Sequence, residues 1–120
     1  MTLTPSIDHY LAMSGPGSGM RITLIRAGDW EVEVIPDRGM DIGRSWWRGK
    51  QVAWIDGPNI PAAGAIAPGD TWLETFRGGL LTTCGPENFG RPSQNGSHTV
   101  PLHGSWTRLR FDITESRVAS

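Results

Sequence analysis

The sequence contains one cysteine, Cys84, in 120 residues, so no disulfide can form within the chain. A lone cysteine is typical of proteins from reducing compartments, and we expect a cytoplasmic location. The first residues lack the basic stretch and apolar run of a secretory signal peptide. No segment approaches the ~20 consecutive apolar residues that a transmembrane helix requires. We therefore expect no membrane partner.

Neither sign of charge is in excess, because 11 basic residues stand against 12 acidic ones and the formal net charge is −1. Proteins that neutralise nucleic-acid phosphates carry basic patches, so we expect no nucleic-acid partner. The 3 histidines, His9, His98 and His103, are scattered, and they form no H-x-H pair and have no cysteine paired with them, which makes a weak case for a metal site. We expect no metal and no other cofactor.

Turn-forming residues are abundant instead, with 16 glycines and 9 prolines. Hydrophobic residues make up 38% of the chain and charged residues 19%, which is typical of a folded domain rather than a disordered one. Frequent turns favour many short strands over long helices. We expect an all-β protein of six to eight strands, with a flexible N-terminal segment over residues 1–20 and one domain over residues 21–120.

Two hairpins are the clearest secondary-structure signals. Residues 21–35 alternate between apolar and polar side chains around a turn at Gly28 and Asp29, which is the period-2 pattern of half-buried strands. Residues 42–55 predict a second hairpin, which turns at residues 48–50.

The second half of the chain alternates loops with shorter signals. Residues 57–70 predict a long loop, and residues 72–76 fit either a short helix or a strand. Residues 78–84 predict a buried strand. A polar loop is expected over residues 85–101, and residues 106–114 alternate like a strand with one solvated face.

The first segment that can carry chemistry is PDRGMDIGRSWWRG, residues 36–49. Asp37, Arg38 and Asp41 lie where one predicted strand ends and the next begins, and Gly39 allows a positive φ or a close backbone approach. One interpretation is a polar surface turn in which Arg38 pairs with Asp37 or Asp41. The other is a binding role, in which Arg38 donates hydrogen bonds to the hydroxyl groups of a ligand.

The second segment is RGGLLTTCGPENFG, residues 77–90. Glycines beside a strand indicate close packing or a bulge. We interpret Cys84 as a small buried core residue, because no neighbouring base is evident that would activate its thiol. Asn88 either caps a turn, which is its commonest role, or bonds a sugar hydroxyl.

The third segment is VPLHGSW, residues 100–106. A lone histidine is more often structural than catalytic, but His103 precedes Gly104, which would let a ligand approach closely. A histidine can give or take a proton near neutral pH. Most of the 6 tryptophans are expected to pack in the core or on strand faces, and Trp106 is the candidate for stacking on a sugar ring because it lies close to His103.

These three segments, in this order, resemble an aldose 1-epimerase-related family of the galactose-mutarotase-like superfamily that is described only as a domain of unknown function. The resemblance lies in PDRGMDIGR, in GGLLTTCG followed by an asparagine and a glycine, and in the later Leu-His-Gly, and it covers about residues 21–104. It implies a twisted antiparallel β-sandwich, the galactose-mutarotase-like supersandwich, of which this chain is the N-terminal portion. A sugar would bind on its concave face.

The resemblance also implies acid–base chemistry, and the histidine that lies in the sugar site of related epimerases falls on His103. There a carboxylate removes the proton of the anomeric hydroxyl while a histidine protonates the ring oxygen, so the ring opens and recloses on its other face. The carboxylate comes from the later half of those relatives. Neither Glu87 nor Glu115 matches its position, and the residues after Gly104 no longer resemble the family.

We therefore expect the binding of a small free sugar, with aldose-epimerase ancestry. His103 would be the acid, and Arg38, Asp41, Asn88 and Trp106 would contact the substrate. Isomerase activity would need completion by a C-terminal half, because the chain is truncated before the base. The alternative is a non-catalytic interaction domain that forms homo-oligomers through open edge strands.

Overall fold

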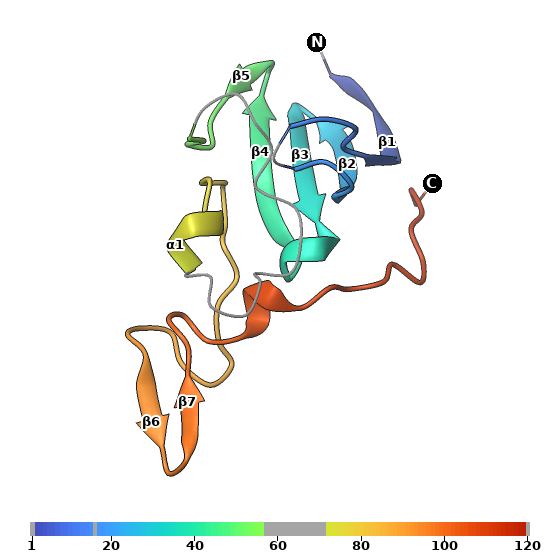
Figure 1. The fold of residues 1–120 in the computed structure, drawn as a ribbon. Helices are drawn as coiled ribbons and strands as arrows, with labels where there is room; N and C mark the ends of the chain where they lie inside the picture. Colours follow the sequence, from blue (N-terminus) through green and yellow to red (C-terminus); the bar gives the residue numbers. More distant parts are fainter. Residues whose placement is uncertain (1, 16, 57–71, 120) are drawn as a thin grey trace.

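The computed structural model describes residues 2–15, 17–56 and 72–119 (Figure 1). A five-stranded sheet in the order β1-β2-β3-β4-β5 dominates it, and a two-stranded sheet, β6-β7, stands apart from the first (Figure 1). All strand pairs are antiparallel. The elements are β1 (Leu3–Leu11), β2 (Arg21–Gly28), β3 (Trp30–Ile35), η1 (Pro36–Arg38), β4 (Asp41–Trp47), β5 (Lys50–Gln51), α1 (Trp72–Thr75), β6 (Ser93–Asn95), β7 (His98–Val100) and η2 (Trp106–Arg108).

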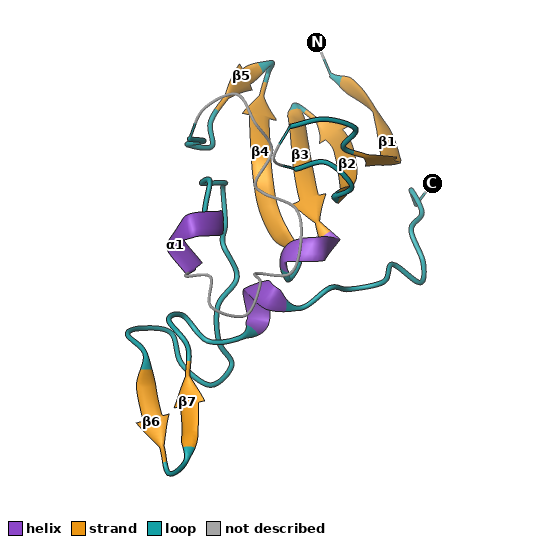
Figure 2. Cartoon of the chain, viewed as in Figure 1, coloured by secondary structure: helices purple, strands orange, loops and turns teal. Residues whose placement is uncertain are grey.

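The all-β antiparallel class predicted from the sequence is confirmed. Within the described ranges, helix is confined to the single turn of α1 and the two 3₁₀ turns η1 and η2 (Figure 2). The five-stranded sheet is consistent with one layer of a β-sandwich. None of the helices in these ranges is long and apolar enough to cross a membrane.

Both predicted hairpins form. The first pairs β2 with β3 across the Gly28 and Asp29 turn, and Ala27 lies opposite Trp30. The second pairs β4 with β5. Its second strand, β5, is only two residues long, because the last residue pair of this hairpin is Trp46 opposite Gln51. Residues 72–76 were predicted to form either a helix or a strand, and they contain the short helix α1.

The N-terminal segment differs from the prediction of a flexible approach. Residues 3–11 form β1, which pairs with β2 from Ser6 opposite Arg26 to Leu11 opposite Arg21. The polar residues in this stretch obscure its alternation, because most of β1 is exposed and needs no apolar face of its own. The described residues of the connection after Leu11, 12–15 and 17–20, form no strand.

Two strands predicted in the second half of the chain are wrong. Residues 78–84 form only isolated bridges at Gly78 and Leu81, because the positive φ of Gly78 and Gly79, 89° and 134°, interrupts an extended path. Residues 106–114 form the turn η2 followed by irregular chain that crosses η1.

Two predicted loops have different outcomes. The predicted polar loop over residues 85–101 contains the hairpin of β6 and β7. The predicted loop over residues 57–70 lies outside the described residues.

The main sheet has one apolar face. Ile7 lies opposite Ile25, Ile25 opposite Val32, and Trp30 opposite Trp47, so these side chains share one side of the sheet. Trp30 is 43% exposed and Trp47 is 40% exposed. Both therefore lie on a strand face, one of the two places predicted for most of the tryptophans, and neither is buried in the core. Among the described residues, the cluster of buried apolar side chains is small and comprises Ala12, Met20, Ile22 and Ile35.

The opposite face of the sheet carries a network of charges. The buried carboxylate of Glu33 accepts two hydrogen bonds from Arg44, at 2.7 and 2.5 Å, and one from the hydroxyl of Tyr10 at 2.6 Å. Burial, this hydrogen bond and the charge of Glu33 raise the pKa of Tyr10 to about 12. The network fixes the register of β1 against β3 across β2.

Tyr10 is the only tyrosine, so its titration can be followed directly by phenolate absorbance. We expect a midpoint at about 12, against ~10 for a free tyrosine. The fold favours the neutral phenol, so its stabilising contribution is complete below pH ~10 and is lost as the pH rises through about 12. Glu33→Gln should return the midpoint toward that of free tyrosine, and a midpoint near ~10 in the folded parent chain would contradict the network.

Candidate functional site

The first motif forms a tight, buried turn between β3 and β4. Pro36 begins η1, and Gly39 ends it in the left-handed region at φ 60°. Asp37 and Arg38 are 2% and 1% exposed. The interpretation of this segment as a polar surface turn is therefore wrong, because the residues after Gly104 and the helix α1 cover it.

The buried charges of this turn are paired separately. Asp37 accepts hydrogen bonds from the side chain of Arg21 at 2.6 and 2.9 Å and from that of Arg110 at 3.2 Å. Burial acts to raise the pKa of Asp37, but the hydrogen bonds from Arg21 and Arg110 outweigh it and hold the pKa below its usual value. Asp37 therefore anchors the C-terminal segment and does not pair with Arg38.

Arg38 pairs instead with Asp41, at 3.2 Å between Nε and Oδ2. Its Nη1 donates to the carbonyl of Thr75 in α1 at 2.9 Å. Its Nη2 is buried and has no hydrogen-bond partner among the described residues. The guanidinium thus ties α1 to the turn and does not face solvent as a ligand contact would.

Asp41 joins the first motif to the second. Its Oδ1 accepts hydrogen bonds from both the backbone N–H and the hydroxyl of Thr83, each at 2.7 Å. Asp41 is 4% exposed, and both of its carboxylate oxygens are engaged, Oδ2 by Arg38 and Oδ1 by Thr83. Sequence reasoning missed Thr83, although it lies within the second motif and threonine is a usual partner for a buried carboxylate.

The second and third motifs are joined by backbone hydrogen bonds. Gly85 donates to the carbonyl of His103 at 2.8 Å, and Trp106 donates to the carbonyl of Gly85 at 2.9 Å. Asn88 holds the same loop, since its side chain donates to the carbonyl of Gly90 and accepts from the N–H of that residue. Asn88 thus makes the turn-capping contacts that were one of its two predicted roles.

Trp106 connects the third motif back to the first. Its indole N–H donates to the carbonyl of Gly39 at 2.9 Å, and its ring lies 5.3 Å from that of Phe111. These contacts use part of the ring surface that would stack on a sugar. We call the place where the three motifs meet the motif junction; it comprises Arg38, Asp41, Thr83, Gly85, Asn88, His103 and Trp106.

His103 is the residue of the motif junction that is best placed for chemistry. It adopts a left-handed backbone conformation at φ 58°, which is uncommon for a residue other than glycine and concentrates at functional sites. Its Nδ1 lies 2.8 Å from the carbonyl oxygen of Phe89. A carbonyl accepts only, so Nδ1 carries the proton and Nε2 is the acceptor of the neutral ring.

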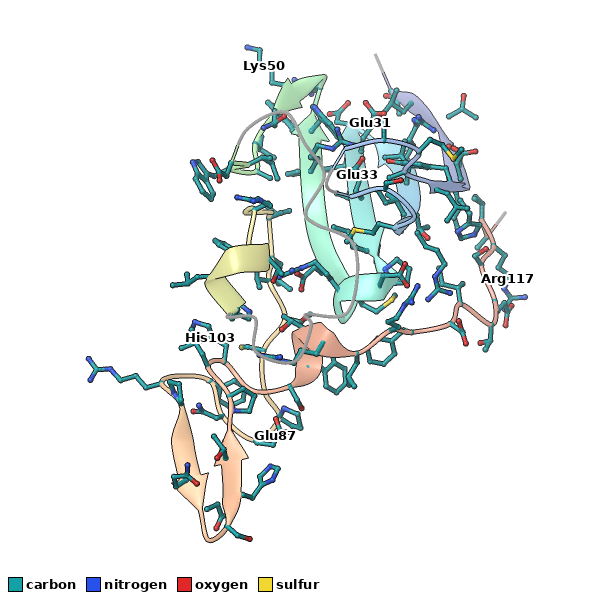
Figure 3. All side chains as sticks on the ribbon, in the orientation of Figure 1. Glu31, Glu33, Lys50, Glu87, His103 and Arg117 are labelled. Carbon is teal, nitrogen blue, oxygen red and sulfur yellow. The ribbon has the colours of Figure 1, made fainter. Side chains whose placement is uncertain are left out.

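The ring of His103 is oriented by Trp72, whose ring lies 4.5 Å away at an interplanar angle of 66°. Figure 3 shows His103 between α1 and the β6-β7 hairpin. Trp72 is 8% exposed, and no sequence signal marked it as a neighbour of the third motif, because the contact spans about thirty residues of chain. His103 itself is partly exposed. The arrangement therefore holds an oriented imidazole in a partly exposed position.

Two other residues of the second motif differ in their surroundings. Cys84 is exposed, so its prediction as a buried core residue is wrong; the strand that would have buried it does not form. Glu87 accepts hydrogen bonds from the hydroxyl and the backbone N–H of Ser105, which hold the pKa of this carboxyl below its usual value. The described ranges contain no group of three or more histidine, cysteine, aspartate or glutamate side chains that could hold a metal.

A cavity of about 700 Å³ lies away from the motif junction, between the end of β1 and the C-terminal segment. Its lining includes His9, Arg21 and Ile113, but none of the five predicted site residues. The candidate site is therefore the motif junction, where the five predicted site residues lie, and not this cavity.

The profile of one protein family matches residues 17–115, and this family is described as a domain of unknown function (DUF4432). The match extends past Gly104, beyond which we expected no resemblance, and so includes η2 and the segment that covers η1. No curated protein and no solved structure matches the chain. Because the matched residues make up most of the chain and contain all three motifs, the chain belongs to the DUF4432 family.

Proposed function

We propose that this chain binds the ring form of a free aldose and descends from aldose 1-epimerase-like isomerases of the galactose-mutarotase-like superfamily. One observation carries the proposal: the three motifs meet at one junction, which includes an oriented, partly exposed histidine, His103, whose Nδ1 is held by the carbonyl of Phe89. An imidazole fixed in this way can donate to or accept from a sugar oxygen through Nε2. The all-β antiparallel sheet and the DUF4432 match are compatible with this ancestry.

Binding is a better proposal for this chain than catalysis. Anomer exchange requires a base as well as an acid, both aligned with the sugar. Two carboxylates of the three motifs are already engaged, Asp41 by Arg38 and Thr83, and Glu87 by Ser105. In this proposal Arg38 and Asp41 hold the motifs together and do not contact the sugar. Isomerase activity would belong to a protein that also supplies a general base.

Asn88 and Trp106 have the remaining roles in the proposal. Asn88 shapes the loop that carries the carbonyl partner of His103, because its side chain bonds residue 90 of that loop. The indole ring of Trp106 borders the motif junction and offers an apolar edge to the sugar ring. The same proposal places the role of the chain in carbohydrate metabolism in the cytoplasm.

The experiment is a titration of the chain with a panel of free aldoses, followed by ligand-observed saturation transfer. We expect weak binding of one or a few of them, with a Kd of the order of 1 mM. His103→Ala should raise the Kd about tenfold or more, because the sugar loses one hydrogen bond to the imidazole.

His98→Ala is the matched control, since His98 is an exposed histidine of β7 outside the motif junction. It should bind the sugar as the parent chain does. Equal loss in both variants, or no saturable binding of any aldose by the parent chain, would overturn the proposal.

A further inference from the structure

The cavity of about 700 Å³ between the end of β1 and the C-terminal segment is a second candidate binding site. Its lining falls within residues 9–13, 21–23 and 112–116 and at Pro36, all of which the structure describes. Small-molecule sites usually have volumes of roughly 300–1,000 Å³. We propose that this cavity binds a neutral, elongated and mostly apolar small molecule. This inference is independent of sugar binding.

Apolar side chains form much of the cavity wall. Ile22 of β2, which is 1% exposed, lies at its buried side. Leu11 is 54% exposed, Met13 is 85% exposed and Ile113 is 38% exposed, and all three line the cavity. Apolar surface that gathers around a hollow and stays in contact with water marks a binding site more often than scattered apolar residues do. An apolar ligand would remove this surface from water, which is favourable.

The charged side chains of the lining already have partners, and this favours a neutral ligand. All three side-chain nitrogens of Arg21 donate hydrogen bonds, Nε and Nη2 to Asp37 and Nη1 to Asp112. Glu115 pairs with Arg117 at 3.0 Å. An anionic ligand would have to displace a carboxylate from Arg21, and a cationic ligand would have to displace a guanidinium from Asp112 or Glu115.

Contacts at both ends hold the C-terminal wall of the cavity in place. At one end, the N–H of Phe111 donates to the carbonyl of Pro36 at 2.9 Å. At the other end the segment returns toward β1 (Figure 1), where the hydroxyl of Ser116 lies 2.9 Å from Nε2 of His9. Nδ1 of His9 lies 2.9 Å from the hydroxyl of Thr23. The wall is therefore formed before a ligand binds, and these few polar groups can orient one polar atom of it.

A second cavity of about 470 Å³ is the reason for an elongated ligand. Both cavities share five lining residues: His9, Thr23, Ile113, Glu115 and Ser116. They therefore lie side by side along the C-terminal segment. The second cavity adds Ile7, Ile25 and Val34 from the apolar face of the main sheet. A ligand that is longer than the first cavity would continue over this apolar face.

The test compares two fluorescent probes that share the same aromatic rings. N-phenylnaphthylamine is neutral, and anilinonaphthalene sulfonate carries one negative charge in addition. We expect the neutral probe to bind the chain with a Kd of roughly 10–100 µM, and the sulfonate to bind at least about tenfold more weakly. Equal or tighter binding of the sulfonate, or no saturable binding of the neutral probe, would overturn the proposal.

A pair of matched variants locates the bound probe. Ile113→Asp places a charge on the wall that both cavities share, so it should raise the Kd of the neutral probe about tenfold or more. Val118→Asp is the control, because Val118 belongs to the same segment, is 50% exposed and lies outside both linings. Its Kd should stay within about twofold of that of the parent chain. A similar rise in the two variants would contradict the proposed site.

A second measurement needs no substitution. In a ¹⁵N–¹H correlation spectrum of the parent chain, the neutral probe should shift the backbone signals of Leu11, Ile22 and Ile113 in a saturable way. The signals of Gly85 and His103, in the motif junction, should stay unchanged. Shifts at the motif junction in place of the cavity would contradict the proposal. Because the probe is not a sugar, this result does not depend on whether any aldose binds.

Discussion

Replacing Asp41 with alanine is expected to lower the free energy of unfolding by about 3–5 kcal/mol, which is the usual cost of removing one partner of a buried ion pair. The loss is large because Asp41 is 4% exposed and serves two partners. Without it the guanidinium of Arg38 stays buried without a counter-charge, and Thr83 loses both of its 2.7 Å hydrogen bonds. Against a total of about 5–15 kcal/mol for a small domain, this loss comes close to unfolding the chain.

Urea unfolding followed by tryptophan fluorescence would measure the effect. Asp56→Ala is the matched control, because Asp56 pairs with Arg77 at the same 3.2 Å but with 57% of its side chain exposed. An exposed pair contributes about 0–1 kcal/mol. Similar losses in Asp41→Ala and Asp56→Ala would show that the two motifs are not held together by the buried carboxylate.

Replacing Gly104 with alanine is the second change for which we expect a large effect. The backbone of Gly104 has φ 77°, which costs a residue with a Cβ roughly 1–2 kcal/mol. A Cβ there would also lie 2.6 Å from the carbonyl oxygen of Gly85 and 2.8 Å from that of Asn88. Neither oxygen can move freely, so overpacking adds about 1–3 kcal/mol. We therefore expect roughly 2–5 kcal/mol of destabilisation, together with displacement of His103.

Gly96→Ala separates the two causes. Gly96 has a similar φ of 62° in the turn between β6 and β7, but a Cβ at this position meets no atom within 4 Å. This variant should lose only the conformational part, roughly 1–2 kcal/mol. Thermal unfolding of both variants gives the comparison. If Gly104→Ala were no less stable than Gly96→Ala, the tight packing of the third motif on the second would be disproved.

Local alternation and turn chemistry explain what the sequence predicts well. The hairpin of β2 and β3 follows from the period-2 pattern around Gly28, and the turn that begins β5 follows from Gly49, whose φ is 75°. Both signals lie within a few residues of the contacts they specify. The strand expected at residues 106–114 has the same alternation. Its backbone instead bonds the turn η1, because Gly39 donates to the carbonyl of Leu109 and Phe111 donates to the carbonyl of Pro36, so the segment crosses η1 and does not join a sheet.

The candidate site was predicted as a set of motifs but not as an arrangement. Arg38, Asp41, Asn88, His103 and Trp106 do lie at one junction, yet the sequence does not indicate that Arg38 and Asp41 are buried. Their burial depends on Thr83 and Thr75, which come from distant parts of the chain. Non-local contacts of this kind leave no periodic signal, and this explains why Trp72 was also missed.

The proposed function depends most directly on where a sugar binds. The measurement is a ¹⁵N–¹H correlation spectrum of the chain during titration with the aldose that binds best in the panel. We expect dispersed peaks, with saturable shifts confined to the motif junction around Gly85, Asn88 and His103. Shifts at His9, Arg21 and Ile113, around the cavity of about 700 Å³, would contradict the assignment of the site, as would no saturable shift with any aldose.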